Sequence, residues 1–142
     1  IAQAQTLIAS YPLTSNLSDA TGTYGDVTLD GNPAPPSGNG ICTNGIFYSN
    51  SGGQRFYTPA ISAFDVTDFQ INVDFKLNSF PGCVVGLGLF STYFALQVNS
   101  SGVPQVVIGP SLILSSSATL TTGQWYSATI KYTSNTVQLI ID

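Results

Sequence analysis

Few side chains in this sequence could transfer a proton during catalysis. All seven acidic residues are aspartates, and the sequence contains no histidine and no glutamate. A serine or cysteine nucleophile therefore lacks an imidazole base. The closest carboxylates in the sequence, Asp65 and Asp68, come just before a predicted strand, where aspartates more often accept backbone N–H groups than form a glycosidase pair. We therefore expect a protein that is not an enzyme.

Two cysteines, Cys42 and Cys83, are the only sulfur-containing residues. They are either two buried free thiols or one disulfide, and a disulfide would close a long loop and stabilise the fold by about 3–4 kcal/mol. Two cysteines without histidine cannot complete the tetrahedral shell of a zinc site. We predict the disulfide, because other features of the sequence point outside the cell.

Aromatic side chains could stack on sugar rings. The candidates are Tyr24, Tyr48, Tyr57, Tyr93 and Trp125. Most of them are better explained as core or strand-surface residues, and they form no cluster in the sequence. The sequence alone therefore assigns no glycan-binding residue.

Charged side chains are rare, at 7% of the residues, and the formal net charge is -4. The basic residues Arg55, Lys76 and Lys131 are far apart in the sequence, so they cannot form the basic stripe that nucleic-acid binding needs. No apolar run approaches the roughly 20 residues of a membrane-spanning helix. We therefore expect neither a nucleic-acid partner nor a transmembrane segment.

The uncharged polar composition, rich in Ser, Thr, Asn and Gly, is typical of secreted surface proteins. At the start of the sequence, Ala2-Gln3-Ala4 resembles the small-x-small cleavage site of a secretory signal. We predict a secreted or cell-surface protein.

Alternation of apolar and polar residues predicts strands and no helix. The clearest case is Phe69–Asn78, in which every second residue is apolar, so that one face would be buried and the other would face water. Asn32–Gly40 contains three prolines and is predicted to be a loop, and Ser134-Asn135 a two-residue turn. The other predicted strands are Thr6–Leu13, Val27–Leu29, Gly45–Ser49, Arg55–Thr58, Val84–Phe90, Tyr93–Val98, Val103–Ile108, Leu112–Leu114, Trp125–Tyr132 and Thr136–Ile141. About ten short strands predict one all-β domain over residues 1–142, a two-sheet sandwich or a barrel.

Three segments resemble laminin-G-like, concanavalin-A-like jelly-roll modules, the family of many lectins and glucanases. Leu7–Gly31 is similar to the family's opening strand, polar loop and short strand ending in glycine. Gly123–Asp142 is similar to its Gly-x-Trp strand, tight turn and following strand ending in Asp, and Phe69–Leu77 matches its long amphipathic strand. The resemblance covers most of the chain and implies a two-sheet antiparallel jelly-roll sandwich.

The same resemblance implies a calcium site, because members of this family often bind Ca²⁺ at the rim of the sandwich. The matching residues are Asp19, Asp26 and Asp30, with Asn16 and loop carbonyls as further oxygen ligands. The alternative is structural: Asp19 would form an Asx turn and Asp30 an Asp-Gly turn. We expect the structural alternative, with no cofactor required.

The family pattern continues with further strands after the position of Asp142, where this sequence stops. Either the sequence is a fragment, or the closing strand comes from elsewhere, with Ile1–Thr6 as a candidate extension or donor segment. By analogy with the family, we expect a non-catalytic extracellular module for adhesion or glycan binding. The alternative is a structural subunit of an extracellular filament or surface layer assembled by β-strand addition between subunits, and a glycosidase remnant is a weaker third possibility.

Overall fold

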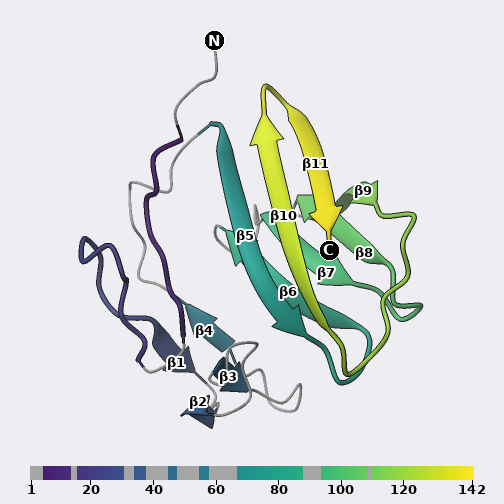
Figure 1. Cartoon of the computed structure of the whole chain (residues 1–142). Helices are drawn as coiled ribbons and strands as arrows, with labels where there is room; N and C mark the ends of the chain where they lie inside the picture. Colours follow the sequence, from purple (N-terminus) through teal and green to yellow (C-terminus); the bar gives the residue numbers. More distant parts are fainter. Residues whose placement is uncertain are drawn as a thin grey trace. The chain divides into compact units, whose positions relative to one another are not determined.

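The computed structural model describes residues 5–13, 16–30, 34–37, 45–47, 55–57, 67–87, 94–108 and 110–142. In these ranges all regular structure is β-strand and no helix is present, as the sequence predicts (Figure 1). The chain divides into two compact units, residues 1–66 and 67–142, which we describe one at a time. The prediction of a single domain is not tested by this division. The described residues include no helix that is long and apolar enough to cross a membrane.

Unit 1 contains two short antiparallel ladders. Strand β1 (Thr28–Asp30) pairs with β4 (Arg55–Tyr57), and β2 (Ala34–Ser37) pairs with β3 (Gly45–Phe47). The strands predicted at Gly45–Ser49 and Arg55–Thr58 contain β3 and β4, but these two strands do not pair with each other.

Two sequence predictions in unit 1 are wrong. Residues 5–13 form no strand, because the Ser10 N–H donates to Asp19 and the Ser10 carbonyl accepts from the Ala20 N–H, so both groups serve a loop contact. The predicted loop Asn32–Gly40 contains β2, whose register shifts between Ala34 and Ser37. Prolines are tolerated in such a short, irregular edge strand because fewer backbone donors are needed there.

In unit 2, a three-stranded antiparallel sheet has the order β11-β10-β5. Its strands are β5 (Phe69–Lys76), β10 (Trp125–Thr133) and β11 (Thr136–Ile141). The hairpin between β10 and β11 turns at Ser134 and Asn135, whose φ angles of 48° and 64° are those of a type I′ turn. The two-residue turn and the amphipathic strand predicted from the sequence are therefore confirmed.

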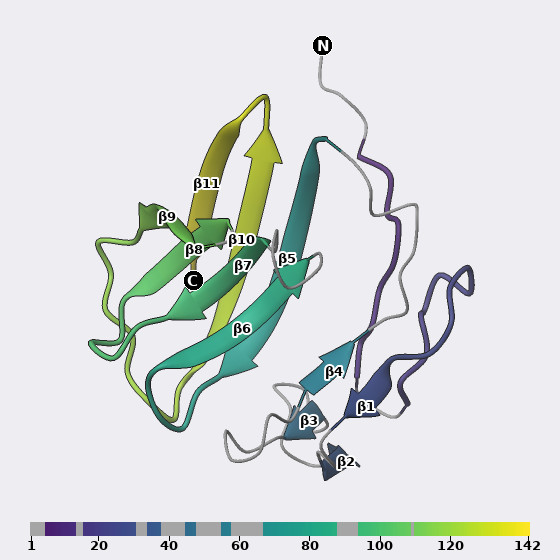
Figure 2. The same ribbon diagram turned by 180° about the vertical axis from the view of Figure 1, so that it is seen from behind.

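The second sheet of unit 2 has four strands in sequence order: β6 (Gly82–Leu87), β7 (Phe94–Val98), β8 (Pro104–Ile108) and β9 (Ser111–Ser115). The chain enters this sheet from β5 and leaves it through residues 116–124, which lead back to β10 (Figure 2). A short turn at Asn99–Gly102 joins β7 to β8, and both strands begin within one residue of the predicted position.

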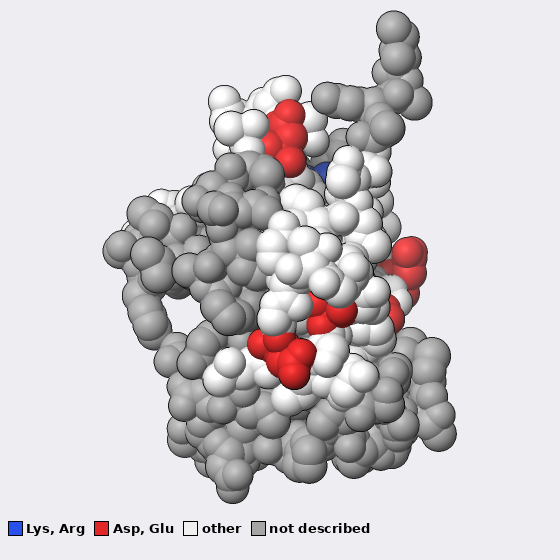
Figure 3. Space-filling view, turned by 90° about the vertical axis from the view of Figure 1, so that its left-hand side faces the viewer, with Lys and Arg blue, Asp and Glu red and all other residues white. Residues whose placement is uncertain are grey.

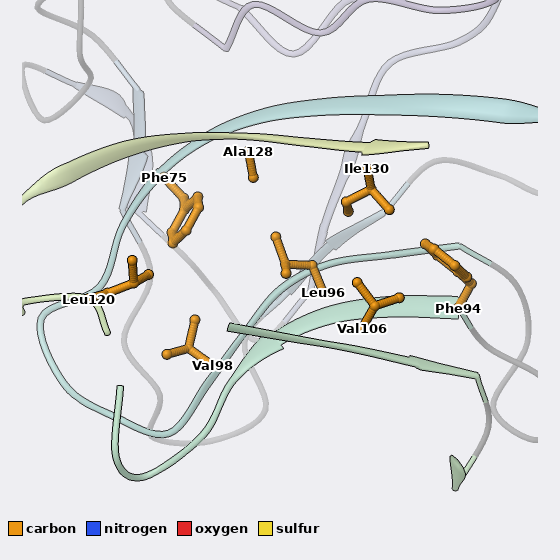
Figure 4. Packing of buried hydrophobic residues seen from close by; sticks show 8 residues of the cluster. All are labelled: Phe75, Phe94, Leu96, Val98, Val106, Leu120, Ala128 and Ile130. Carbon is orange, nitrogen blue, oxygen red and sulfur yellow. The ribbon is translucent and has the colours of Figure 1, made fainter. Parts of the chain in front are cut away.

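The inner faces of these two sheets form one hydrophobic core. In Figure 4, Ala128 and Ile130 of β10 point toward Leu96 of β7 and Val106 of β8. The buried cluster comprises Phe75, Phe94, Leu96, Val98, Val106, Leu120, Ala128 and Ile130. Because alternate residues of each strand point inward, the remaining residues of β5, β10 and β11 must face outward. Unit 2 is thus a two-sheet antiparallel sandwich, as the sequence predicts.

Candidate functional site

The outward residues of the three-stranded sheet form a polar surface, which we call the outer face. Its position follows from the register, since the alternate residues of each strand pack on the core. The outer face comprises Gln70, Asn72, Asp74, Lys76, Trp125, Ser127, Thr129, Lys131, Thr133, Thr136, Gln138 and Ile140. These side chains take no part in the core of unit 2.

Hydrogen bonds between strands order the centre of the outer face. The Ser127 hydroxyl donates to Asp74 Oδ1 at 2.5 Å, and the Thr129 hydroxyl donates to Asn72 Oδ1 at 3.0 Å. The Gln70 amide also donates to Asn72 Oδ1, at 2.9 Å. Asp74 Oδ2 and Asn72 Nδ2 have no hydrogen-bond partner among the described residues. The face therefore presents an acceptor and a donor to solvent, two residues apart on one strand.

Trp125 lies beside these pairs, at one end of the outer face. It is half-buried and stands opposite Lys76 in the ladder between β10 and β5. The Lys76 ammonium lies 5.4 Å from the centre of the indole ring, a distance suited to a cation–π interaction. A half-buried indole ring, with Lys76 over it, and polar side chains thus share one sheet face.

A shallow hollow lies toward the other end of the outer face. Its lining consists of Lys131, Thr133, Thr136 and Gln138, all from the β10–β11 hairpin. Lys131 pairs with Gln138 and Thr133 with Thr136, so the register alone brings the four side chains together. Lys131 forms no ion pair with a described residue.

Asp19, the first residue of the predicted calcium set, is a structural residue of unit 1. Its Oδ1 accepts the N–H groups of Ser10 at 2.9 Å and Thr21 at 3.0 Å, and the latter bond is an Asx turn. Its Oδ2 accepts the Thr21 hydroxyl and the N–H groups of Thr23 and Tyr24 at 3.2 and 3.1 Å. Burial raises the pKa of Asp19, but the hydrogen bonds from Ser10, Thr21 and Tyr24 outweigh burial and hold the pKa well below its usual value.

This arrangement does not suit a calcium ligand. Both Asp19 oxygens are surrounded by donors, and a cation would have to displace these hydrogen bonds. Asp26 is exposed, and Asp30 lies in β1 opposite Arg55, with a side chain outside the described part of the structure. The described residues contain no group of three acidic or sulfur side chains that could hold a metal. The calcium site stays a prediction, and the geometry of Asp19 argues against its participation.

Charge near Asp19 also affects Tyr11. The Tyr11 hydroxyl donates to the Gly25 carbonyl at 3.3 Å. Burial raises the pKa of Tyr11, and the negative charges of Asp19 and Asp26 raise it further. Figure 3 shows acidic side chains in red on one face of the described residues, most of which are neither acidic nor basic.

The residues predicted to form the disulfide, and several of the aromatic candidates, lie partly or wholly outside the described residues. Cys42 lies outside the described residues, and Cys83 lies in β6 opposite Gln97 with its side chain not described, so the disulfide stays a prediction. Among the aromatic candidates, Tyr48 and Tyr93 lie outside the described residues, and Tyr57 is described only as part of β4.

Sequence reasoning missed the polar residues that surround Trp125. Alternation places Asn72 and Asp74 on one side of β5, and it also places Ser127 and Thr129 opposite the apolar residues of β10. The missing information was the register, which brings these two sets together across strands far apart in the sequence. Comparisons of the chain with protein-family models, with curated proteins and with solved structures found no match, so the functional argument depends on the site itself.

Proposed function

We propose that this protein is a non-catalytic extracellular module that binds a glycan on the outer face of its three-stranded sheet. The supporting observation is the position of Trp125 next to two ordered polar pairs, Asp74–Ser127 and Asn72–Thr129. Partner proteins or cell-surface ligands that display such a glycan would give the module its role in adhesion.

The chemistry of this face matches that of a sugar. A pyranose ring has an apolar face of C–H groups that packs on an aromatic ring, and hydroxyl groups that both donate and accept hydrogen bonds. Asp74 Oδ2 offers an acceptor, Asn72 Nδ2 offers a donor, and both are held by neighbouring hydroxyls before a ligand arrives. Such preorganisation lowers the entropy lost on binding.

Catalysis is not part of this proposal. Asp74 and Asp142 are the acidic residues opposite Ser127 on the two neighbouring strands, and both are exposed. A glycosidase needs one carboxyl group kept protonated as general acid, usually by burial, together with a second as base or nucleophile. An open sheet surface supplies binding contacts instead. We also expect binding without calcium, because Asp19 is committed to backbone donors.

A glycan array, probed with and without added calcium and with EDTA, tests the proposal. The expected result is binding of a small set of glycans that Trp125→Ala abolishes and Trp125→Phe partly retains, with no effect of EDTA. Ser117→Ala, an exposed position away from the outer face, is the control and should bind normally. The absence of binding under every condition, or equal binding by Trp125→Ala, would overturn the proposal.

A second candidate function, a structural subunit assembled by strand addition, is favoured by the edge of β11. This strand carries no charge, and its Ile140 side chain is 46% exposed. Ser127 and Asp142 exchange backbone hydrogen bonds, so alternation directs the backbone groups of Val137, Leu139 and Ile141 away from β10. An uncharged edge of this kind accepts another strand readily.

Sedimentation and electron microscopy distinguish this alternative. A subunit that assembles through β11 should form concentration-dependent polymers that Ile140→Lys suppresses. If Ile1–Thr6 is the donor, deletion of that segment should suppress them too. A chain that stays monomeric at every concentration would exclude assembly through this edge.

A further inference from the structure

We infer that the hollow around Lys131 binds an anionic group carried by the glycan, a carboxylate or a sulfate. This inference rests on the proposed glycan-binding function and names the chemical class of the ligand. The ligand would be an acidic saccharide that extends along β10, with a neutral ring near Trp125 and an acidic substituent at Lys131.

The lining of the hollow has the composition of an anion site. Lys131 supplies one positive charge, and Thr133, Thr136 and Gln138 supply neutral groups that can donate hydrogen bonds. No carboxylate lines the hollow, and Lys131 has no ion-pair partner among the described residues. Hydrogen bonds from an ammonium to a carboxylate or sulfate are charge-assisted and stronger than those between neutral groups.

Distance separates this hollow from the acidic part of the outer face. Ser127, with Asp74 and Asp142 opposite it, precedes Lys131 by four residues on β10, which corresponds to about 13 Å along a strand. Exposed charges farther apart than about 8 Å are largely screened at physiological ionic strength. Asp74 and Asp142 therefore have little influence on an anion bound at Lys131.

Asp68 is the acidic residue closest to the hollow in the register. Its Oδ1 accepts the N–H of Ser134 at 2.9 Å, and Ser134 belongs to the turn that follows Thr133. Asp68 therefore helps to fix the turn, while its negative charge opposes anion binding. Replacing Asp68 with a neutral residue should therefore strengthen anion binding, whereas replacing Lys131 with a neutral residue should weaken it.

The spacing along β10 suits an oligosaccharide. Trp125 and Lys131 both point outward and are six residues apart, about 20 Å along an extended strand. Ser127 and Thr129 lie between them on the same face, so a ligand bound at both ends would pass over the ordered polar pairs. The outward side of β10 thus offers an aromatic ring, neutral hydrogen-bonding groups and a cation in that order along the strand.

Binding of tetragalacturonate, compared with its fully methyl-esterified form, tests the inference, because esterification removes the charge and keeps the sugars. A sulfated galactan tetramer, compared with the unsulfated tetramer, forms the second arm. The wild-type protein should prefer at least one acidic ligand over its neutral counterpart by roughly three- to tenfold, the range of a single exposed charge contact. Isothermal titration at two salt concentrations should show the preference shrinking at the higher one.

Variants complete the design. Lys131→Gln should lose the preference while it still binds the neutral ligand, Lys131→Arg should keep the preference, and Asp68→Asn should increase it. An undiminished preference in Lys131→Gln would overturn the inference. The glycan-binding proposal would survive that result if Trp125→Ala still abolished binding, whereas failure of the wild-type protein to bind any array glycan would remove both.

Discussion

Replacement of Gly102 by alanine tests whether close packing against residues 116–124, the segment that leads to β10, constrains the β7–β8 turn. Gly123→Ala is the matched control. The two glycines have nearly identical backbone angles, with φ of 79° and 78°. A Cβ at Gly102 would lie 2.9 Å from the Leu120 carbonyl oxygen and 2.9 Å from Phe80 Cε2, whereas a Cβ at Gly123 would have no neighbour within 4 Å. Both substitutions thus force an alanine into the left-handed conformation, but only the alanine at Gly102 would also clash with neighbouring atoms.

The expected magnitudes follow from these two terms. An alanine in the left-handed region costs about 1–2 kcal/mol, and the reduced freedom of the unfolded chain returns about 0.4–1 kcal/mol. Gly123→Ala should therefore lower the free energy of unfolding by about 1 kcal/mol. At Gly102 overpacking adds about 1–3 kcal/mol, because the Leu120 oxygen belongs to the backbone and the Leu120 N–H already donates to the Gly102 carbonyl at 2.8 Å. We expect a total loss of about 2–4 kcal/mol there.

Urea unfolding followed by tryptophan fluorescence measures both losses. Trp125 is the only tryptophan in the sequence and lies in β10, so its emission reports on unit 2. The two variants should unfold with similar dependence on urea concentration and with separated midpoints. Equal losses of stability in the two variants would refute the argument that the contacts of Gly102 with Leu120 and Phe80 constrain this turn.

Three further substitutions test other parts of the structure. Asp19→Asn should lower the thermal midpoint at neutral pH more than Asp26→Asn does. Because hydrogen bonds hold the pKa of Asp19 low in the folded state, this difference should shrink as the pH falls below the usual aspartate value of 3.8, where the unfolded chain takes up a proton and the folded chain does not. Leu96→Ala, at a side chain that is 0% exposed, should cost about 3–5 kcal/mol in chemical unfolding. Ser134→Asn, which keeps the hydrogen bond from the Tyr132 hydroxyl to Asn135, should raise the midpoint slightly, by about 0.5 kcal/mol of stability, since Asn adopts the positive φ of the type I′ turn more readily than Ser does; a lower midpoint would contradict the assigned turn.

Local patterns were sufficient to predict much of unit 2. The alternation in Phe69–Asn78 identifies β5 and the side that it buries, because a strand has a period of two residues. Short turns at Asn99–Gly102 and Ser134-Asn135 connect strands that are adjacent in sequence, so pairing follows directly from proximity. The pairing of β10 with β5 could not be predicted in this way, because more than forty residues separate the two strands, and alternation alone does not define a register.

Unit 1 was predicted poorly for a different reason. The segment Thr6–Leu13 has the alternation of a strand, but the carboxylate of Asp19 and the N–H of Ala20 take up the backbone groups of Ser10. A side chain nine residues away thus replaces the neighbouring strand as hydrogen-bond partner. The Asx-turn tendency of Asp19 was visible in the sequence, whereas the additional bonds to Ser10, Thr23 and Tyr24 depend on the path of the chain.

The distribution of the few charged residues supports a functional role for the outer face. Exposed ion pairs contribute only about 0–1 kcal/mol, so folding gives little reason to place charges on a sheet surface. Lys76 and Lys131 nevertheless both lie on the outer face, although the whole sequence contains only three basic residues. Lys76, in β5, lies over Trp125, and Lys131, in β10, lies in a hollow without carboxylates, so the two cations lie toward opposite ends of the outer face. A ligand that spans β10 would meet a cation toward each end and the carboxylates of Asp74 and Asp142 between them, and this placement favours a saccharide whose acidic group is at the Lys131 end.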